Sequence, residues 1–223
     1  MHRAPLGFVL VLFGLVAQDA WGHKPVVIDG GPTGPASAYV IDDVTVSQVG
    51  YHTVTPDAPQ LWFTFEAEAG QQLYFELGVP KIDRLEGLRP AMVLLGPGLP
   101  AVTLPFAVPE GLGGIVFNTA GEETEVFDEE FTGTTSWKWP AVTPTAQQSG
   151  KYYAVAWLPD ADTGKLWMAV GTAESFGLGD ILSLPTTLFQ VRAFHEIGPF
   201  GGLLFWAMLA FLLVLVFLIR LLF

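Results

Sequence analysis

The C-terminal end of the chain is the part that most constrains its fold. From Leu203 to Phe223, the only residue that is not apolar is Arg220. About 20 apolar residues in a helix cover the roughly 30 Å hydrocarbon core of a bilayer. Trp206 and Arg220 stand near the two ends of this stretch, where aromatic and basic residues are common at membrane interfaces. We therefore expect residues 200–223 to form one transmembrane helix; the alternative is a signal for a GPI anchor.

The N-terminal end has the pattern of a secretory signal peptide. A short basic region precedes an apolar core at Leu6–Ala17, and small residues follow it. The sequence Ala20-Trp21-Gly22 fits the small-x-small rule for cleavage. We expect residues 1–22 to be removed, which makes His23 the N-terminus; an uncleaved anchor is the alternative. The two ends together predict a single-pass protein of the cell membrane, with its ectodomain on the periplasmic or extracellular side.

Composition excludes several classes of function. The chain has 22 acidic and 10 basic residues and a formal net charge of −12, which argues against a nucleic-acid partner. It has no cysteine, which excludes disulfide scaffolds, thiol enzymes and cysteine-ligated metal sites. Asn118 is its only asparagine and only five lysines are present, a bias that is typical of a GC-rich bacterial gene.

The region between the two ends reads as an all-β domain, a jelly-roll-like β-sandwich over residues 23–175. Proline and glycine interrupt it every 8–12 residues, and the runs between them are β-branched and aromatic. The run 91–95 is typical of a strand in a sandwich core. Two hairpins are also predicted, which join 61–66 with 72–77 and 151–157 with 165–170.

The order of these segments resembles the bacterial pre-peptidase C-terminal (PPC) type of β-sandwich over residues 44–171. The matching residues are Trp62-Phe63-Thr64-Phe65, Ala69-Gly70, Leu73-Tyr74-Phe75, Val93-Leu94-Leu95, Ser149-Gly150-Lys151-Tyr152-Tyr153 and Leu166-Trp167-Met168-Ala169-Val170. The resemblance implies an accessory domain without catalysis that binds other proteins, polysaccharide or calcium. An insertion at about 99–146 departs from the pattern, so no binding residue is carried over.

The insertion is the most acidic part of the chain. Seven acids and no base lie between Glu110 and Glu130. Carboxylate oxygens are ligands that calcium prefers, so Asp128, Glu129 and Glu130 are candidate calcium ligands. The alternatives are a docking surface for a basic partner and a solvated loop.

Two tryptophans, Trp137 and Trp139, follow the acidic stretch. An exposed indole can stack on a sugar ring or contact a partner protein, and a buried one fills a core or an interface. We predict an interaction role for both residues and leave the core as the alternative.

Residues 176–199 have the pattern of a juxtamembrane helix. Asp180 can cap a helix that starts at Ile181, and Pro185 fits its first turn. Arg192 can extend its charge to the lipid headgroups. Apolar residues recur at helical spacing at Leu188, Val191 and Phe194 or His195. The helix is expected either at the lipid surface or a partner, where Arg192 would be an interaction residue, or packed under the sandwich.

No catalytic motif stands out. The sequence has no G-x-S-x-G, H-E-x-x-H or phosphate-binding loop. A copper site is a further hypothesis, because an N-terminal His23 offers its amine and its imidazole, and His52 would add a third nitrogen. Such nitrogen ligands suit copper(II).

These features predict a non-catalytic, membrane-anchored, extracytoplasmic interaction module. We expect it to be an accessory subunit that docks on an integral-membrane or envelope protein complex. The alternative is a ligand-binding module for polysaccharide, calcium or copper.

Overall fold

The computed structural model describes residues 24–28, 34–161, 163–175 and 178–222. The predicted signal peptide (1–22) and the candidate copper ligand His23 lie outside the described residues.

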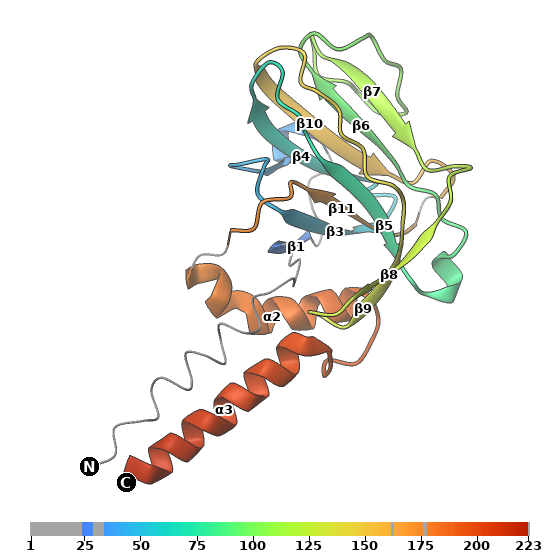
Figure 1. The fold of residues 1–223 in the computed structure, drawn as a ribbon. Coiled ribbons are helices and arrows are strands. Elements are labelled where there is room, and N and C mark those ends of the chain that lie inside the picture. The colour runs from blue at the N-terminus through green and yellow to red at the C-terminus, as the bar shows by residue number, and fades with distance from the viewer. Residues whose placement is uncertain (1–23, 29–33, 162, 176–177, 223) are drawn as a thin grey trace.

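Two β-sheets lie face to face and form a sandwich (Figure 1). Among the described residues, the first sheet has the order β1 (Lys24–Ile28), β3 (Gln48–Val54), β11 (Gly164–Val170), β5 (Phe75–Pro80), β9 (Thr134–Lys138) and β8 (Glu125–Glu129). The second has the order β2 (Tyr39–Val40), β4 (Gln60–Ala67), β10 (Gly150–Trp157), β6 (Ala91–Gly96) and β7 (Gly113–Asn118). β1 and β2 pair in parallel with β3 and β4, and the other pairs are antiparallel. The predicted all-β sandwich is confirmed.

The central strands are apolar because both of their faces are covered. In β4, Phe63 and Phe65 point into the core between the sheets, whereas Trp62 points to the outer face. A segment from Val102 to Leu112 covers that outer face. Helix α2 covers the outer face of the other sheet. Burial on both faces explains why these strands read as continuous apolar runs.

Both predicted hairpins are wrong in their pairing, although their strands exist. β4 and β5 belong to different sheets, and so do β10 and β11. Phe65 of β4 and Phe75 of β5 reach the same core from opposite sides, so the chain between them has to cross from one sheet to the other. The partner of β4 is β10, which comes much later in the sequence.

The acidic insertion, 99–146, contains three strands joined by turns and irregular segments. Its strand β7 extends the second sheet beyond β6, and its hairpin β8–β9 extends the first sheet beyond β5. The insertion therefore supplies one edge strand to each sheet of the sandwich.

Two helices follow the last strand. α2 (Leu178–Phe194) packs on β1 and β3, as the packed alternative predicted, and it begins at Leu178, three residues before the start expected at Ile181. α3 (Gly202–Leu222) extends away from the sandwich (Figure 1). Among the described residues, the structure has no helix with the length and apolar character needed to cross a membrane, which leaves the transmembrane helix predicted at 200–223 without structural support.

Candidate functional site

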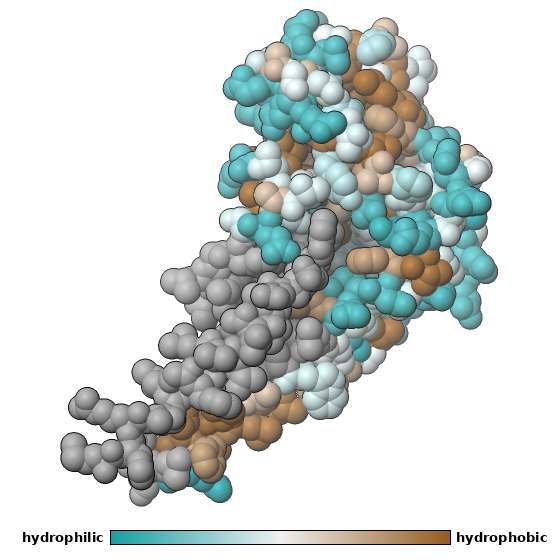
Figure 2. Space-filling view, viewed as in Figure 1, coloured by the Kyte–Doolittle hydropathy of each residue, from teal (hydrophilic) through white to brown (hydrophobic). Residues whose placement is uncertain are grey.

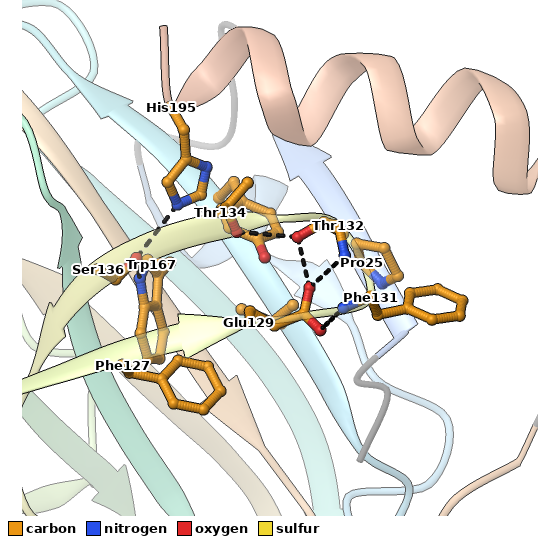
Figure 3. A pocket seen from close by; sticks show the side chains of 11 residues that line it. Pro25, Phe127, Glu129, Phe131, Thr132, Thr134, Ser136, Trp167 and His195 are labelled. Atoms are coloured by element: carbon orange, nitrogen blue, oxygen red, sulfur yellow. Dashed lines mark hydrogen bonds between the residues drawn. The ribbon is translucent and has the colours of Figure 1, made fainter. Parts of the chain in front are cut away.

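The end of α2 meets the β8–β9 hairpin in a polar contact that we call the joint (Figure 3). The joint comprises Ser136, Trp167, Arg192 and His195 together with the turn 129–134. A small cavity of about 30 Å³, which is partly open to solvent, lies beside these residues. A space of this size holds one or two water molecules and excludes a substrate.

A chain of hydrogen bonds crosses the joint. The indole of Trp167 donates to Ser136 Oγ over 3.0 Å, and Ser136 Oγ lies 3.1 Å from His195 Nε2. His195 Nδ1 lies 2.8 Å from the carbonyl oxygen of Val191, which can only accept. Nδ1 therefore carries the proton in the neutral ring, and Nε2 accepts from the Ser136 hydroxyl. The direction of every bond in the chain is fixed.

His195 is neutral over the physiological range. Its burial lowers its pKa from 6.5 to about 4, and the positive charges of Lys165 and Arg192 act in the same direction. The hydrogen bond to Val191 opposes this shift without cancelling it.

Arg192 is the most connected side chain of the joint. Only 6% of its surface is exposed. Nη1 donates to the carbonyl oxygens of Thr132 and Gly133 over 2.6 and 3.1 Å, Nε donates to Gly198 over 2.7 Å, and Nη2 donates to Phe200 over 3.0 Å. The prediction that Arg192 reaches a lipid surface is therefore wrong: its charge is buried and binds backbone carbonyls of this chain.

The first residue of α3 touches the backbone of the β8–β9 turn. Gly133 and Gly202 have φ values of 64° and 75°, which favour glycine. A Cβ on Gly202 would lie 2.5 Å from the carbonyl carbon of Thr132. The close contact and the bonds of Arg192 together fix the start of α3 against the sandwich.

An ion-pair cluster on the surface also connects the end of α2 to the sandwich. Glu196, just after α2, accepts hydrogen bonds from Arg84 of the short helix η2 (Asp83–Leu85), and it pairs with Lys165 of β11 over 2.7 Å. These two cations lower the pKa of Glu196 to about 2. Lys165 also donates to the carbonyl oxygen of Phe194 over 2.7 Å.

The three predicted calcium ligands do not converge. Glu129 accepts from the backbone N–H groups of Phe131 and Thr132 over 2.8 Å each, so it stabilises the β8–β9 turn. Asp128 accepts from the Thr135 hydroxyl over 2.7 Å, and Glu130 is exposed. Within the described ranges, no group of three or more histidine, aspartate or glutamate side chains is placed to hold a metal ion.

The candidate copper ligand His52 is only 1% exposed, and its Nε2 lies 2.9 Å from the carbonyl oxygen of Ala58. In the β1–β3 strand pair, His52 lies opposite Ile28, which is at the other end of β1 from Lys24. The first described residue therefore lies about 13 Å along the strand from the level of His52. Copper binding at His23 and His52 stays a prediction.

The two candidate interaction tryptophans belong to one apolar cluster. Trp139 is 3% exposed and packs with Val79 and Leu85, and Trp137 is half-buried against them. Trp139 is therefore a core residue, as the alternative predicted, and its faces are not free to stack on a sugar.

A second cavity, which we call the slot, opens between the sheets. It has a volume of about 400 Å³ and lies between β5, the β6–β7 pair and the segment 139–142. The sequence pattern predicts neither the slot nor the joint. The joint connects residues such as Ser136 and His195, which lie 59 positions apart.

No family model and no curated protein sequence matches the chain. Among solved structures, it is similar to the pre-peptidase C-terminal domain of a collagenase from Bacillus anthracis, with 11% identity and a TM-score of 0.34 over 62% of this chain and 99% of the other. This is the type of sandwich that the order of the strand segments in the sequence resembles.

Two further structures show a similar degree of likeness. One is CorA, a surface-associated copper-binding protein of Methylomicrobium album BG8, with 12% identity and a TM-score of 0.35 over 61% of this chain and 98% of the other. The other is the secreted protein MopE of Methylococcus capsulatus, in which an oxidised tryptophan facilitates copper binding, with 12% identity and a TM-score of 0.29 over 68% of this chain and 100% of the other.

Proposed function

We propose that this protein is a non-catalytic interaction module on the extracytoplasmic side of the cell membrane. The C-terminal helix α3 inserts into the lipid bilayer, and the joint holds the sandwich in one orientation on that helix. The exposed apolar surface of α3 carries the proposal.

Large apolar side chains cover α3. Those that are exposed are Trp206, Leu209, Phe211, Leu212, Leu213, Val214, Val216, Phe217 and Ile219. Figure 2 shows brown, apolar surface along this helix, beyond the mostly polar surface of the sandwich. Soluble monomers rarely leave so large a continuous apolar patch in water. Insertion into lipid removes these side chains from water.

The joint supports a structural role in place of catalysis. Ser136 and His195 have the distance of a nucleophile and its base, but each is only 4% exposed and their cavity is about 30 Å³. An attacking hydroxyl needs a neighbouring space for the reacting carbon. The pair instead fixes α2 against the hairpin.

Charge supports docking of the sandwich on a basic partner. The chain carries 22 acidic against 10 basic residues, and exposed acids gather on the insertion. A surface of one sign steers association with a surface of the opposite sign. An integral-membrane or envelope protein complex with a basic extracytoplasmic face fits this role.

Extraction of bacterial membranes at alkaline pH tests the attachment. The full chain should stay in the membrane pellet, and the variant L213D/F217D should appear in the supernatant, because charged side chains are costly in lipid. The matched control L213A/F217A should stay in the pellet. Release of the unchanged chain into the supernatant would refute attachment through α3.

A further inference from the structure

Three of the four edge strands of the described sandwich carry features that discourage pairing with another chain. β1 has Lys24 and Pro25, β2 has only two residues, and β8 has the acids Glu125, Asp128 and Glu129. Charge, proline and short length are common ways in which proteins protect the edge of a sheet. β7, at the margin of the second sheet (Figure 1), has six residues, GGIVFN, without charge or proline. It is therefore the edge best suited to pair with another strand.

The pairing of β7 with β6 shows where its free backbone groups lie. In an antiparallel pair, alternate residues point their N–H and C=O groups toward the neighbouring strand or away from it. The N–H of Gly114 points away from β6, because it donates to the carbonyl oxygen of Pro100 over 2.8 Å. The register with β6 is regular from Gly113 to Asn118, so the backbone groups of Val116 and Asn118 point away as well. Within the described ranges, these groups have no other backbone partner.

This free edge is accessible, and it borders the slot. Val116 is 42% exposed, and Asn118 is exposed as well. Both line the slot, which lies between β7 and the segment 139–142 and has a volume of about 400 Å³. In an added strand, the side chains on the same side as Ile115 and Phe117, which pack against the core, would face this space. The slot therefore leaves room for small side chains of a strand that pairs with β7.

The charge around this edge favours a basic segment over a second copy of the chain. Glu122 and Glu123 follow β7 and are exposed, whereas Arg89, over the ring of Trp139, offsets one of these charges. A second copy would bring the same acids to the edge, and each chain has a formal net charge of −12. Like charges repel and opposite charges attract across an interface. The suitable occupant is therefore an extended segment with basic residues at its ends.

We propose that β7 binds an extended segment of another protein, which pairs with it as an added strand. Backbone hydrogen bonds to Val116 and Asn118 hold the segment, and its basic ends lie beside the acids that follow β7. This mode of recognition is the addition of a strand to an exposed sheet edge. The inference rests on the proposed docking on a basic partner and names the edge where that docking occurs. It does not depend on the insertion of α3 into lipid.

Asn118 provides a selective probe of this edge, because it is the only asparagine of the chain. Labelling with ¹⁵N-asparagine in the full chain in lipid nanodiscs gives a single backbone amide signal, that of an N–H at the free edge. The ligand is a short acetylated peptide amide of alternating valine and threonine, with a lysine at each end. It should shift the Asn118 amide signal and slow its hydrogen exchange, since the N–H gains a carbonyl partner.

Two further peptides of the same length separate backbone pairing from charge. A peptide in which every central amide is N-methylated cannot donate hydrogen bonds from these groups, so it should bind about tenfold more weakly. A peptide with glutamate in place of lysine keeps the backbone and reverses the charge, so it should bind about threefold more weakly.

A proline at position 116 tests the edge from the side of the protein. Val116→Pro removes an N–H that points away from β6, and proline is accepted at such positions of edge strands. The variant should keep its near-UV circular dichroism spectrum and bind the lysine peptide about tenfold more weakly. The matched control Val116→Thr keeps the N–H and should bind as the unchanged chain does. Both variants should stay in the membrane pellet, which separates this test from that of attachment.

The proposal is overturned if the N-methylated peptide binds equally well or if the folded Val116→Pro variant binds as tightly as the unchanged chain. If Val116→Pro does not fold, the N-methylated peptide decides on the unchanged chain. Equal binding of the glutamate peptide would overturn the basic character of the segment.

Two other outcomes would assign the edge or the docking differently. Binding of the lysine peptide, measured by fluorescence anisotropy, without a response of Asn118 would overturn the assignment to β7 and leave docking on a basic partner standing. Protection of the Asn118 amide in the free chain that is lost on dilution would show a second copy at this edge, which also overturns the proposal.

Discussion

The joint and the slot are both built from the acidic insertion, yet they are opposite in character. The β8–β9 hairpin supplies Ser136 and the carbonyl oxygens that hold Arg192, around a cavity of about 30 Å³. β7 and the segment 139–142 line a cavity of about 400 Å³ whose walls are both polar and apolar. The insertion therefore makes dense polar contacts at the joint and leaves a much larger cavity at the slot.

Because of this difference, amino-acid substitutions should affect stability differently in the two regions. In the joint, the buried donors and acceptors are matched to one another, and loss of one group leaves another buried without a partner. At the mouth of the slot, Ala141 is exposed, so a larger side chain added there extends into solvent. We therefore expect substitutions to be costly in the joint and nearly neutral at the mouth of the slot.

Arg192→Ala should have the largest effect. It leaves the carbonyl oxygens of Thr132, Gly133, Gly198 and Phe200 without their donor, so we expect the free energy of unfolding to fall by about 3 kcal/mol or more. Urea unfolding followed by near-UV circular dichroism measures the loss. Arg84→Ala, which breaks an exposed ion pair, should cost much less. Equal losses for both variants would remove the distinction between the joint and the surface.

The pH dependence of stability should show an effect of intermediate size. The pKa of His195 is about 4 in the folded protein and 6.5 in the unfolded chain, so the unfolded chain binds more protons between these values. Stability should be highest above pH 6.5 and fall as the pH drops toward 4, by roughly 3 kcal/mol at most from this residue. The measurement is the slope of unfolding free energy against pH, compared with that of His195→Phe.

Glu76 and Glu196 also affect the dependence of stability on pH. Comparing the unchanged protein with His195→Phe isolates the contribution of His195. Burial raises the pKa of Glu76, whereas the contribution of Glu196 is lost only as the pH falls below about 4.5, toward its pKa of about 2. These groups are present in both proteins. If His195→Phe keeps the full slope between pH 6.5 and 4, the histidine is not its source.

Ala141→Trp should have the smallest effect. Ala141 is exposed at the mouth of the slot, so the indole enters space that no side chain occupies. We expect the free energy of unfolding to change by less than about 0.5 kcal/mol. The same urea titration checks this, and a loss as large as that of Arg192→Ala would show that the mouth is as tightly packed as the joint.

Sequence reasoning found the strands because each is a continuous apolar run, as at 91–95 and 151–157. It paired them wrongly because a hairpin is inferred from closeness in sequence, whereas β4 and β5, and likewise β10 and β11, belong to different sheets. Arg192 stands out in the sequence through its place among apolar residues. Its true partners, the carbonyl oxygens at 132 and 133, belong to a distant hairpin, and no local pattern marks them.

The order of strands also has a consequence for the time course of folding. β3 pairs with β11 and β4 pairs with β10, so Val54 meets Gly164 and Ala67 meets Gly150. Neither sheet can close until the ribosome has supplied the last strands. Such high contact order is typical of domains that fold in roughly milliseconds to seconds. The nascent chain therefore exposes its apolar strands through most of its synthesis, and chaperones have that interval in which to engage it.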